Sequence, residues 1–267
     1  MKKLLTVLSV FMRVRIKGEF EYRMSFYIDT LSFILGYGSQ ALLMYLMVDS
    51  FHTINGWTPL EVMMLYAYTL ASYTLCNMFL GNITDNLIGR VRSGEFDLTL
   101  VRPMNPLLFE ISTAFSGYYF LHFLMALCLI VIGFVRMNVV FSVGKMLVAA
   151  TSIIGGALIQ GGVLLLFSSA SFGLINNPLT SGMYSSIRSI IEYPITIYPK
   201  PVQFLFTFII PLAFVGFFPV QNLGGSTTLE NSPPILQCLS LPVGMAFFSL
   251  ACCIWIRALN SYKSTGS

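Results

Sequence analysis

Residues 82–106 read NITDNLIGRVRSGEFDLTLVRPMNP and form the most highly charged interruption between two apolar blocks of the chain. Ile83, Leu87 and Val91 recur at a spacing of four, which predicts a short amphipathic helix over the first half of the stretch. Gly94 should end this helix, because glycine readily leaves the helical region.

Charged residues of both signs follow one another through this stretch. A charged surface helix between two membrane spans is a candidate docking surface for a soluble partner. The alternative is a solvated loop that lies on lipid headgroups. The residues concerned are Asp85, Arg90, Arg92, Glu95, Asp97 and Arg102.

The composition is that of an integral membrane protein. Of the 267 residues, 56% are hydrophobic and only 10% are charged, and the mean hydropathy is +0.78. Soluble domains carry about 25% charged residues. No segment outside the apolar blocks is long enough for an independent soluble domain. We therefore expect one membrane domain over residues 25–267.

Six apolar blocks are each long enough to cross the membrane, since a spanning helix needs about 20 apolar residues. The predicted fold is all-α and polytopic, with six transmembrane helices and a cytoplasmic helix between spans two and three. The blocks lie at about 25–48, 59–80, 107–135, 146–171, 201–220 and 236–256.

The N-terminal segment, residues 1–24, begins like a signal peptide but has no small-residue cleavage site. Its polar and apolar residues separate onto two faces, which predicts an amphipathic helix lying in the membrane interface. A cleaved or spanning segment is the alternative. The basic residues on this helix are Lys2, Lys3, Arg13, Arg15 and Lys17.

Lysine and arginine are distributed unevenly between the predicted loops. The two termini and the segments 81–106 and 172–200 hold thirteen of them, whereas the other three loops hold only Arg136 and Lys145. Basic residues gather on the cytoplasmic side of membrane proteins, so both termini and 81–106 should be cytoplasmic. A helix around 181–191 would then lie in a cytoplasmic loop.

Local signals mark several helix boundaries. Thr58 to Glu61 forms a capping box with proline at the first helical position, and Asn105-Pro106 gives another start of this kind. Pro211 falls in the middle of the fifth block and predicts a kink. Ala157 and Gly161 form a pair of small residues that would let another helix approach closely.

Motifs of hydrolytic or nucleotide chemistry are absent from the sequence. There is no GxxxxGK[ST], HExxH or GxSxG, and no cysteine-histidine spacing typical of a metal site. The basic residues are spread among short loops, which argues against nucleic-acid binding. Polar residues within spans are functional candidates, although structural roles such as interhelix hydrogen bonding, burial or interface contact are the favoured explanation. They are Asp29, Glu110, His122 and Gln160.

The ordered pattern resembles the permease subunits of ABC-2 type transporters, in the branch of six-span bacterial permeases. The stretch from Ile88 to Leu107 is similar to the family's "I..G..D..L.RP.NP" segment. The matching positions are Ile88, Gly94, Asp97, Leu100, Arg102, Pro103, Asn105 and Pro106. The stretch EYPITIYPKPVQFLFTFIIPLAFVGFFP, residues 192–219, and the basic N-terminal segment are also similar to the family.

The resemblance implies a bacterial inner-membrane exporter subunit, paired with a second copy or a homologous permease and with a separate ATPase that binds ATP and Mg²⁺. This chain would carry no cofactor. Its substrate would be a small molecule, a peptide or a lipid-like molecule. The coupling region to the ATPase would comprise Ile83, Leu87, Arg90, Val91, Arg92, Gly94, Glu95, Asp97 and Arg102.

This hypothesis predicts that charged residues at Ile83, Leu87 and Val91 would uncouple the ATPase without unfolding the spans. Two alternatives stay open. A self-sufficient secondary transporter or channel would need ionisable groups within its spans, and a membrane scaffold subunit would have no transport activity.

Overall fold

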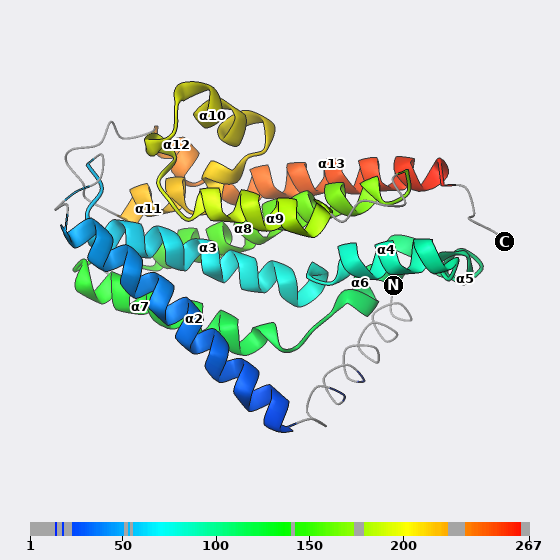
Figure 1. The fold of residues 1–267 in the computed structure, drawn as a ribbon. Coiled ribbons are helices and arrows are strands. Elements are labelled where there is room, and N and C mark those ends of the chain that lie inside the picture. The colour runs from blue at the N-terminus through cyan, green and yellow to red at the C-terminus, as the bar shows by residue number, and fades with distance from the viewer. Residues whose placement is uncertain are drawn as a thin grey trace.

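The computed structural model describes residues 14, 18, 23–50, 53, 56–139, 142–173, 179–223 and 233–262. These parts of the chain form helices and no strand, as predicted (Figure 1). The predicted interfacial helix over 1–24 lies almost wholly outside the described residues, and with it Lys2, Lys3, Arg13, Arg15 and Lys17.

Four helices in the described parts are long and apolar enough to cross a membrane, judged by length and composition. They are α2 (Arg23–Ser50), α7 (Tyr119–Arg136), α8 (Val143–Ala170) and α13 (Ser240–Asn260). The predicted six continuous spans are therefore only partly reproduced.

Helix α3 (Pro59–Leu80) lies at the centre of the bundle, and 15 of its 22 residues are buried. The predicted capping box is confirmed: the Glu61 carboxylate accepts a hydrogen bond of 2.9 Å from the Thr58 backbone N–H, and the Thr58 hydroxyl accepts one from the Glu61 backbone. These bonds satisfy N–H groups that have no partner within the helix.

The segment after α3 forms three short helices at one end of the bundle: α4 (Ile83–Ser93), α5 (Phe96–Leu100) and α6 (Pro106–Ala114). The Asn105 side chain caps α6, as predicted, by accepting from the backbone N–H groups of Leu107 and Leu108. Helix α4 ends before Gly94, which has a φ of 75°, a left-handed conformation that favours glycine.

The predicted span 107–135 is not one helix. It breaks between α6 and α7, where Phe115 has an extended backbone with ψ of 132°. The Ser116 N–H donates to the Met78 carbonyl, 2.9 Å away, so the interruption is anchored on α3. Periodicity did not reveal this break, because the sequence stays apolar across it.

The predicted span 201–220 is also not a continuous helix, and Pro211 ends regular structure rather than bending it. Ile210 is extended and Pro211 has a ψ of 53°. Proline lacks the N–H needed to continue a helix and disfavours helical conformation in the residue before it. The pieces are α10 (Lys200–Phe204), a π-helical turn (Leu205–Ile209), a 3₁₀ turn (Leu212–Phe214) and α11 (Phe217–Leu223).

This segment enters the bundle and returns to the same end. Ile195, before it, and Phe217, near its close, line the same small cavity. The Phe217 ring lies 5.3 Å from that of Trp57, next to the start of α3. Between them Val215 reaches Gly156 in the middle of α8. The segment is therefore re-entrant, and α12 (Pro234–Gln237) follows it beside α10 and α11 (Figure 1).

Helix α9 (Leu179–Ile191) matches the helix predicted around 181–191. The sequence leaves open whether this segment lies flat on the inner surface or partly re-enters the membrane. In the structure α9 lies antiparallel to α3. Tyr184, near the start of α9, makes a side-chain hydrogen bond with Asn77, near the end of α3. At the end of α9, the Ile191 carbonyl accepts a hydrogen bond of 3.3 Å from the hydroxyl of Thr69, which lies earlier in α3. Helix α9 therefore packs along α3 inside the bundle.

Glycines bring α8 and α13 into backbone contact. A Cβ built on Gly244 would lie 2.9 Å from the Gly155 Cα, and one on Gly161 would meet Leu80 at 2.7 Å. The close approach predicted from small residues of α8 is confirmed, although Gly155 makes the tightest contact, rather than Ala157. Both helices run in the same direction, since Phe172 at the end of α8 meets Trp255 of α13.

Candidate functional site

A cavity of about 600 Å³ opens between α2, α3 and α9, and we call it the central cavity. Tyr66 and Tyr73 line it from α3, and Arg188, Ser189 and Glu192 line it from α9 and the turn after it. The contribution of α2 comes mostly from one face of that helix. The residues from α2 are Ser32, Phe33, Gly36, Tyr37 and Gln40.

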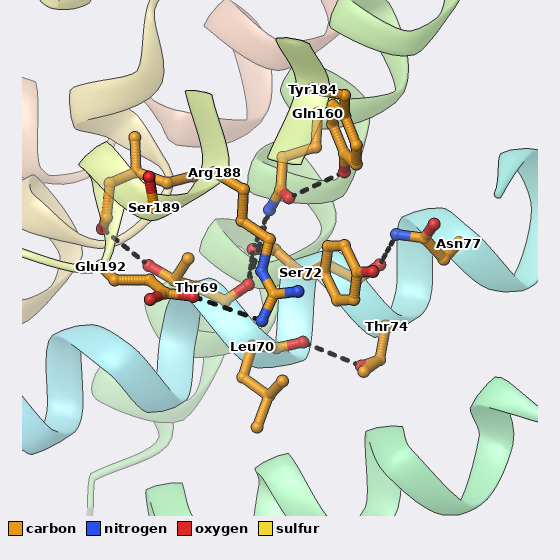
Figure 2. Close-up of polar contacts among 12 residues, drawn as sticks. Thr69, Leu70, Ser72, Thr74, Asn77, Gln160, Tyr184, Arg188, Ser189 and Glu192 are labelled. Carbon is orange, nitrogen blue, oxygen red and sulfur yellow. Dashed lines mark hydrogen bonds and ion pairs between the residues drawn. The ribbon is translucent and has the colours of Figure 1, made fainter. Parts of the chain in front are cut away.

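Arg188 and Glu192 form an ion pair in this cavity, with 3.2 Å between Nη2 and Oε1 (Figure 2). Only 20% of the arginine side chain and 12% of the glutamate side chain are exposed. The guanidinium carbon lies 3.9 Å from the centroid of the Tyr73 ring and 5.7 Å from that of Tyr37. Two aromatic rings and one carboxylate therefore fix the position of the guanidinium.

The ion pair sits midway along the bundle. At about 1.5 Å per residue, Tyr37 is about 21 Å from the start of α2, and Tyr73 is about 21 Å from the start of α3. Charged side chains at such depth cost about 3 kcal/mol each to insert into a membrane, and those that occur there usually serve a function. This pair is thus the first candidate for a site within the bundle.

Two polar groups at the central cavity have no hydrogen-bond partner among the described residues. They are the buried Tyr66 hydroxyl and the Nε of Arg188. Buried polar groups normally have partners, so an orphan group calls for an explanation. His122, in α7, adjoins the cavity through Phe33, whose ring lies 4.2 Å from the imidazole. Both His122 nitrogens are likewise unpartnered within the described chain.

A second polar network holds α9 against α3 and α8. The Gln160 amide donates to the Ser72 hydroxyl at 2.8 Å, and the Tyr184 hydroxyl donates to the Gln160 carbonyl at 3.3 Å (Figure 2). The interhelix hydrogen bonding predicted for Gln160 is therefore confirmed. Because this network fixes Tyr184, one turn before Arg188, it also positions the ion pair.

The predicted coupling residues divide between the inside and the outside of the bundle. Ile83, Leu87 and Val91 are fully buried in an apolar cluster with residues of α8 and α13, including Leu165 and Trp255. A charged residue at any of these buried positions would disrupt this packing, which argues against uncoupling without loss of stability. The stripe fastens α4 to the bundle.

Arg90 also turns toward the protein. Its Nη1 lies 2.8 Å from Oε1 of Glu110, which is fully buried in α6. The guanidinium carbons of Arg90 and Arg102 lie 5.2 Å and 4.5 Å from the centroid of the Phe109 ring. These contacts join α4, α6 and the turn between α5 and α6.

The remaining predicted residues and several unpredicted ones form an outward surface, which we call the α4–α5 face. Arg92, Glu95 and Arg102 are exposed on it, Asp97 is half-buried, and Gly94 supplies the turn between the two helices. Sequence reasoning missed its apolar part: Leu98 is 62% exposed and Val101 is 81% exposed. Leu98 and Val101 lie outside the periodic stripe of Ile83, Leu87 and Val91, and this could have indicated that they do not face the same apolar cluster.

Sequence reasoning also missed the ion pair of the central cavity, because the sequence pattern predicts a cytoplasmic loop for the segment that holds Arg188 and Glu192. Arg188 and Glu192 are four residues apart, as in a helical ion pair, and Ile187, Ile190 and Ile191 are their neighbours in sequence. This pattern could have indicated an ion pair on an otherwise apolar helix. No group of three or more histidine, cysteine, aspartate or glutamate side chains in the described chain would hold a metal ion.

A comparison with protein-family models found a match over residues 34–266 to the family described as ABC-2 family transporter protein. Comparisons with curated proteins and with solved structures found no match. The matched range includes the α4–α5 face, all of the central cavity except Ser32 and Phe33, and the re-entrant segment, and extends over most of the chain. The chain therefore belongs to the ABC-2 family of transporter proteins.

Proposed function

We propose that this chain is the permease subunit of an ATP-driven exporter and that it is coupled to a separate ATPase through the α4–α5 face. The observation that carries the proposal is the combination of exposed apolar and charged residues on a helix pair that is anchored from within. Leu98 and Val101 give the face an apolar centre, while Arg92, Glu95 and Arg102 surround it with charge. Protein interfaces commonly combine an apolar core with a polar rim.

The anchoring supplies a route for force. A push on the α4–α5 face would reach α8 and α13 through the buried stripe of Ile83, Leu87 and Val91, and α6 through Arg90 and Glu110. The ATPase would bind ATP and Mg²⁺, and its ATP-driven closure would push on the α4–α5 face. Rigid elements with two arrangements transmit such a change, and α4 is joined to three of them.

The proposed orientation places the α4–α5 face in the cytoplasm. With Arg188 inside the bundle and Lys200 at the opposite end, eleven basic residues remain on the inner side and three on the outer side. The bias still favours cytoplasmic termini. Tyr262, just after α13, lies beside Phe96 of α5, with 5.2 Å between ring centroids, so this end of α13 shares the proposed inner side.

We further propose a dimer with a second copy or a homologous permease in a bacterial inner membrane. Helices α2 and α13 are largely exposed within this chain, which leaves surface for lipid and for another permease. The proposed direction is export, which rests on the family resemblance alone.

The test is purification of the tagged chain from native membranes, followed by mass spectrometry of what accompanies it and an ATPase assay in liposomes. We expect a P-loop ATPase in near-stoichiometric amount. Leu98→Asp and Val101→Asp should remove the ATPase from the complex. The matched control is Arg136→Glu, an exposed residue at the far end of α7, which should leave the complex intact. A chain that is purified alone and intact would refute the proposal.

The buried ion pair favours one alternative function, a secondary transporter driven by an ion gradient. Such transporters use ionisable groups within the membrane, and Arg188 with Glu192 would be the pair concerned. Gradient-driven uptake by the chain alone in liposomes, without an ATPase, would establish this alternative over the first.

A further inference from the structure

The central cavity is lined by an arginine that has an unpartnered donor and by a tyrosine whose hydroxyl is unpartnered among the described residues. Arg188 has five N–H donors and gives Nη2 to Glu192, which is the only carboxylate among the lining residues, whereas its Nε has no partner in the described chain. The Tyr66 hydroxyl is a further unpartnered group, and its side chain is 1% exposed. A ligand that satisfies these groups must present acceptor oxygens.

The aromatic surround fixes the direction in which the guanidinium can meet a ligand. The guanidinium carbon lies over the Tyr73 ring, Tyr37 makes a side-chain hydrogen bond with Arg188, and Glu192 pairs with Nη2. Arginine binds carboxylates and phosphates through the N–H groups on its edges, often with two parallel bonds. The Nε–H is the donor of this guanidinium that is left without a partner in the described chain, so an anionic group would bind on the edge that carries Nε.

The cavity opens beside α2. Gly36 lines it and is exposed, and a Cβ built on that glycine would find no atom within 4 Å. The neighbouring surface of α2 is apolar, with Leu31 and Leu35 both exposed. A molecule with its polar group at Arg188 would lay an apolar part along this surface.

We propose that the central cavity is the binding site for an anionic amphiphile, a molecule that joins a carboxylate or phosphate group to an apolar body. The anionic group pairs with the guanidinium edge of Arg188, and the Tyr66 hydroxyl donates to the same group. Glu192 competes for Arg188 and weakens binding, which allows release. The identification of this ligand as a transported substrate rests on the function proposed above, whereas binding itself does not.

The experiment is titration of the full-length chain, purified in a neutral detergent, by native mass spectrometry. Lysophosphatidic acid and lysophosphatidylcholine with the same acyl chain are the matched probes. We expect lysophosphatidic acid to bind at least tenfold more tightly. Phosphatidylglycerol distinguishes the sources of the ligand: displacement of the single-chain probe by it identifies a membrane lipid, and no displacement identifies a single-chain amphiphile.

Two substitutions give opposite expected responses. Arg188→Gln should weaken binding of lysophosphatidic acid at least tenfold, whereas Glu192→Gln should strengthen it severalfold, because the competing charge is removed. Glu110→Gln, which removes the carboxylate charge of the Arg90–Glu110 ion pair outside the cavity lining, is the control and should leave the affinity for lysophosphatidic acid unchanged. Arg188→Lys, which keeps the charge, and Tyr66→Phe serve if Arg188→Gln fails to fold; each should weaken binding.

Equal binding of the two probes, or equal effects of Arg188→Gln and Glu192→Gln, would overturn this inference. The latter is the result expected of an ion pair that only stabilises the fold. Failure here with an ATPase still co-purified would leave the proposed function standing. Selective binding by a chain that has no ATPase partner would support the ligand site and contradict the proposed coupling to an ATPase.

Discussion

Arg90 Nη1 lies 2.8 Å from Oε1 of the fully buried Glu110, and this ion pair joins the end of α4 to α6. The arginine that the sequence placed on a docking surface is thus occupied by a carboxylate of its own chain. Its contribution to coupling would be to hold α4 in position, while Arg92 and Arg102 remain on the α4–α5 face.

Loss of the arginine should cost more than loss of the glutamate. Arg90→Gln leaves the Glu110 carboxylate buried without its charge partner, and we expect a loss of about 3 kcal/mol in the free energy of unfolding. Glu110→Gln should cost less, because 22% of the Arg90 side chain is exposed and can reach water. Thermal unfolding in detergent measures both. Equal losses would contradict the assignment.

The buried stripe of α4 should behave as protein core. Leu87→Ala removes a fully buried side chain and should lower the free energy of unfolding by about 2–5 kcal/mol. Val101→Ala, on the α4–α5 face, should change it by less than about 0.5 kcal/mol but weaken the ATPase complex. Thermal unfolding and co-purification separate the two effects. A stable Leu87→Ala protein without its ATPase would argue for a docking role of the stripe.

Gly94 and Gly89 differ in backbone conformation and should respond in opposite directions to substitution by alanine. Gly94 has a φ of 75°, where a Cβ costs about 1–2 kcal/mol. Gly89 lies within α4, and a Cβ there would meet nothing within 4 Å, so Gly89→Ala should stabilise the helix by about 0.5–1 kcal/mol. Thermal unfolding of both variants is the measurement, and the same sign of change would be inconsistent with the structure.

The re-entrant segment can be located by labelling. Lys200→Cys, in a variant without the five native cysteines, should react with an impermeant maleimide added outside spheroplasts. Arg257→Cys, near the C-terminal end of α13 and on the proposed inner side, should react only after the membrane is opened. Labelling of Lys200→Cys only after opening would restore the arrangement expected from the sequence, with this residue in an inner loop.

The glycine contact between α8 and α13 predicts a position-specific cost. Gly244→Ala would place a Cβ 2.9 Å from the Gly155 Cα, and backbone atoms cannot give way as side chains do. We expect a loss of about 1–3 kcal/mol in the free energy of unfolding. Gly144→Ala, where the nearest atom is 3.9 Å away, is the control and should be near neutral by the same thermal assay.

The sequence predicted the helices that are marked by local chemistry. The Thr58 and Asn105 caps, the end of α4 at Gly94 and the packing of Gln160 all depend on residues close in sequence or on one strong preference. The break after Ala114 and the re-entrant path around Pro211 depend on partners elsewhere, such as Met78 and Gly156. The hydropathy of a segment does not depend on such distant partners, so a hydropathy pattern cannot reveal these two breaks.

The central cavity was beyond reach for the same reason. The apolar block at 201–220 is long enough to be predicted as one of six membrane spans. The segment before it, which holds Arg188 and Glu192, is then predicted to be a loop. When the position of a short helix relative to the bundle is unknown, its charged residues are predicted to be exposed to solvent. The burial of that charge comes from Tyr37 and Tyr73 on two other helices, which the sequence alone does not bring together.

The backbone contact of Gly155 with Gly244 has a consequence for movement. Helices that are this close at Gly155 and Gly244 cannot slide past one another without opening a void, so we expect α8 and α13 to move as one unit. Helix α2, whose surface is mostly free, and α9, held by side-chain hydrogen bonds, are the members with room to shift. Conformational change in this permease would therefore open the bundle along its ion-paired side and leave the glycine seam shut.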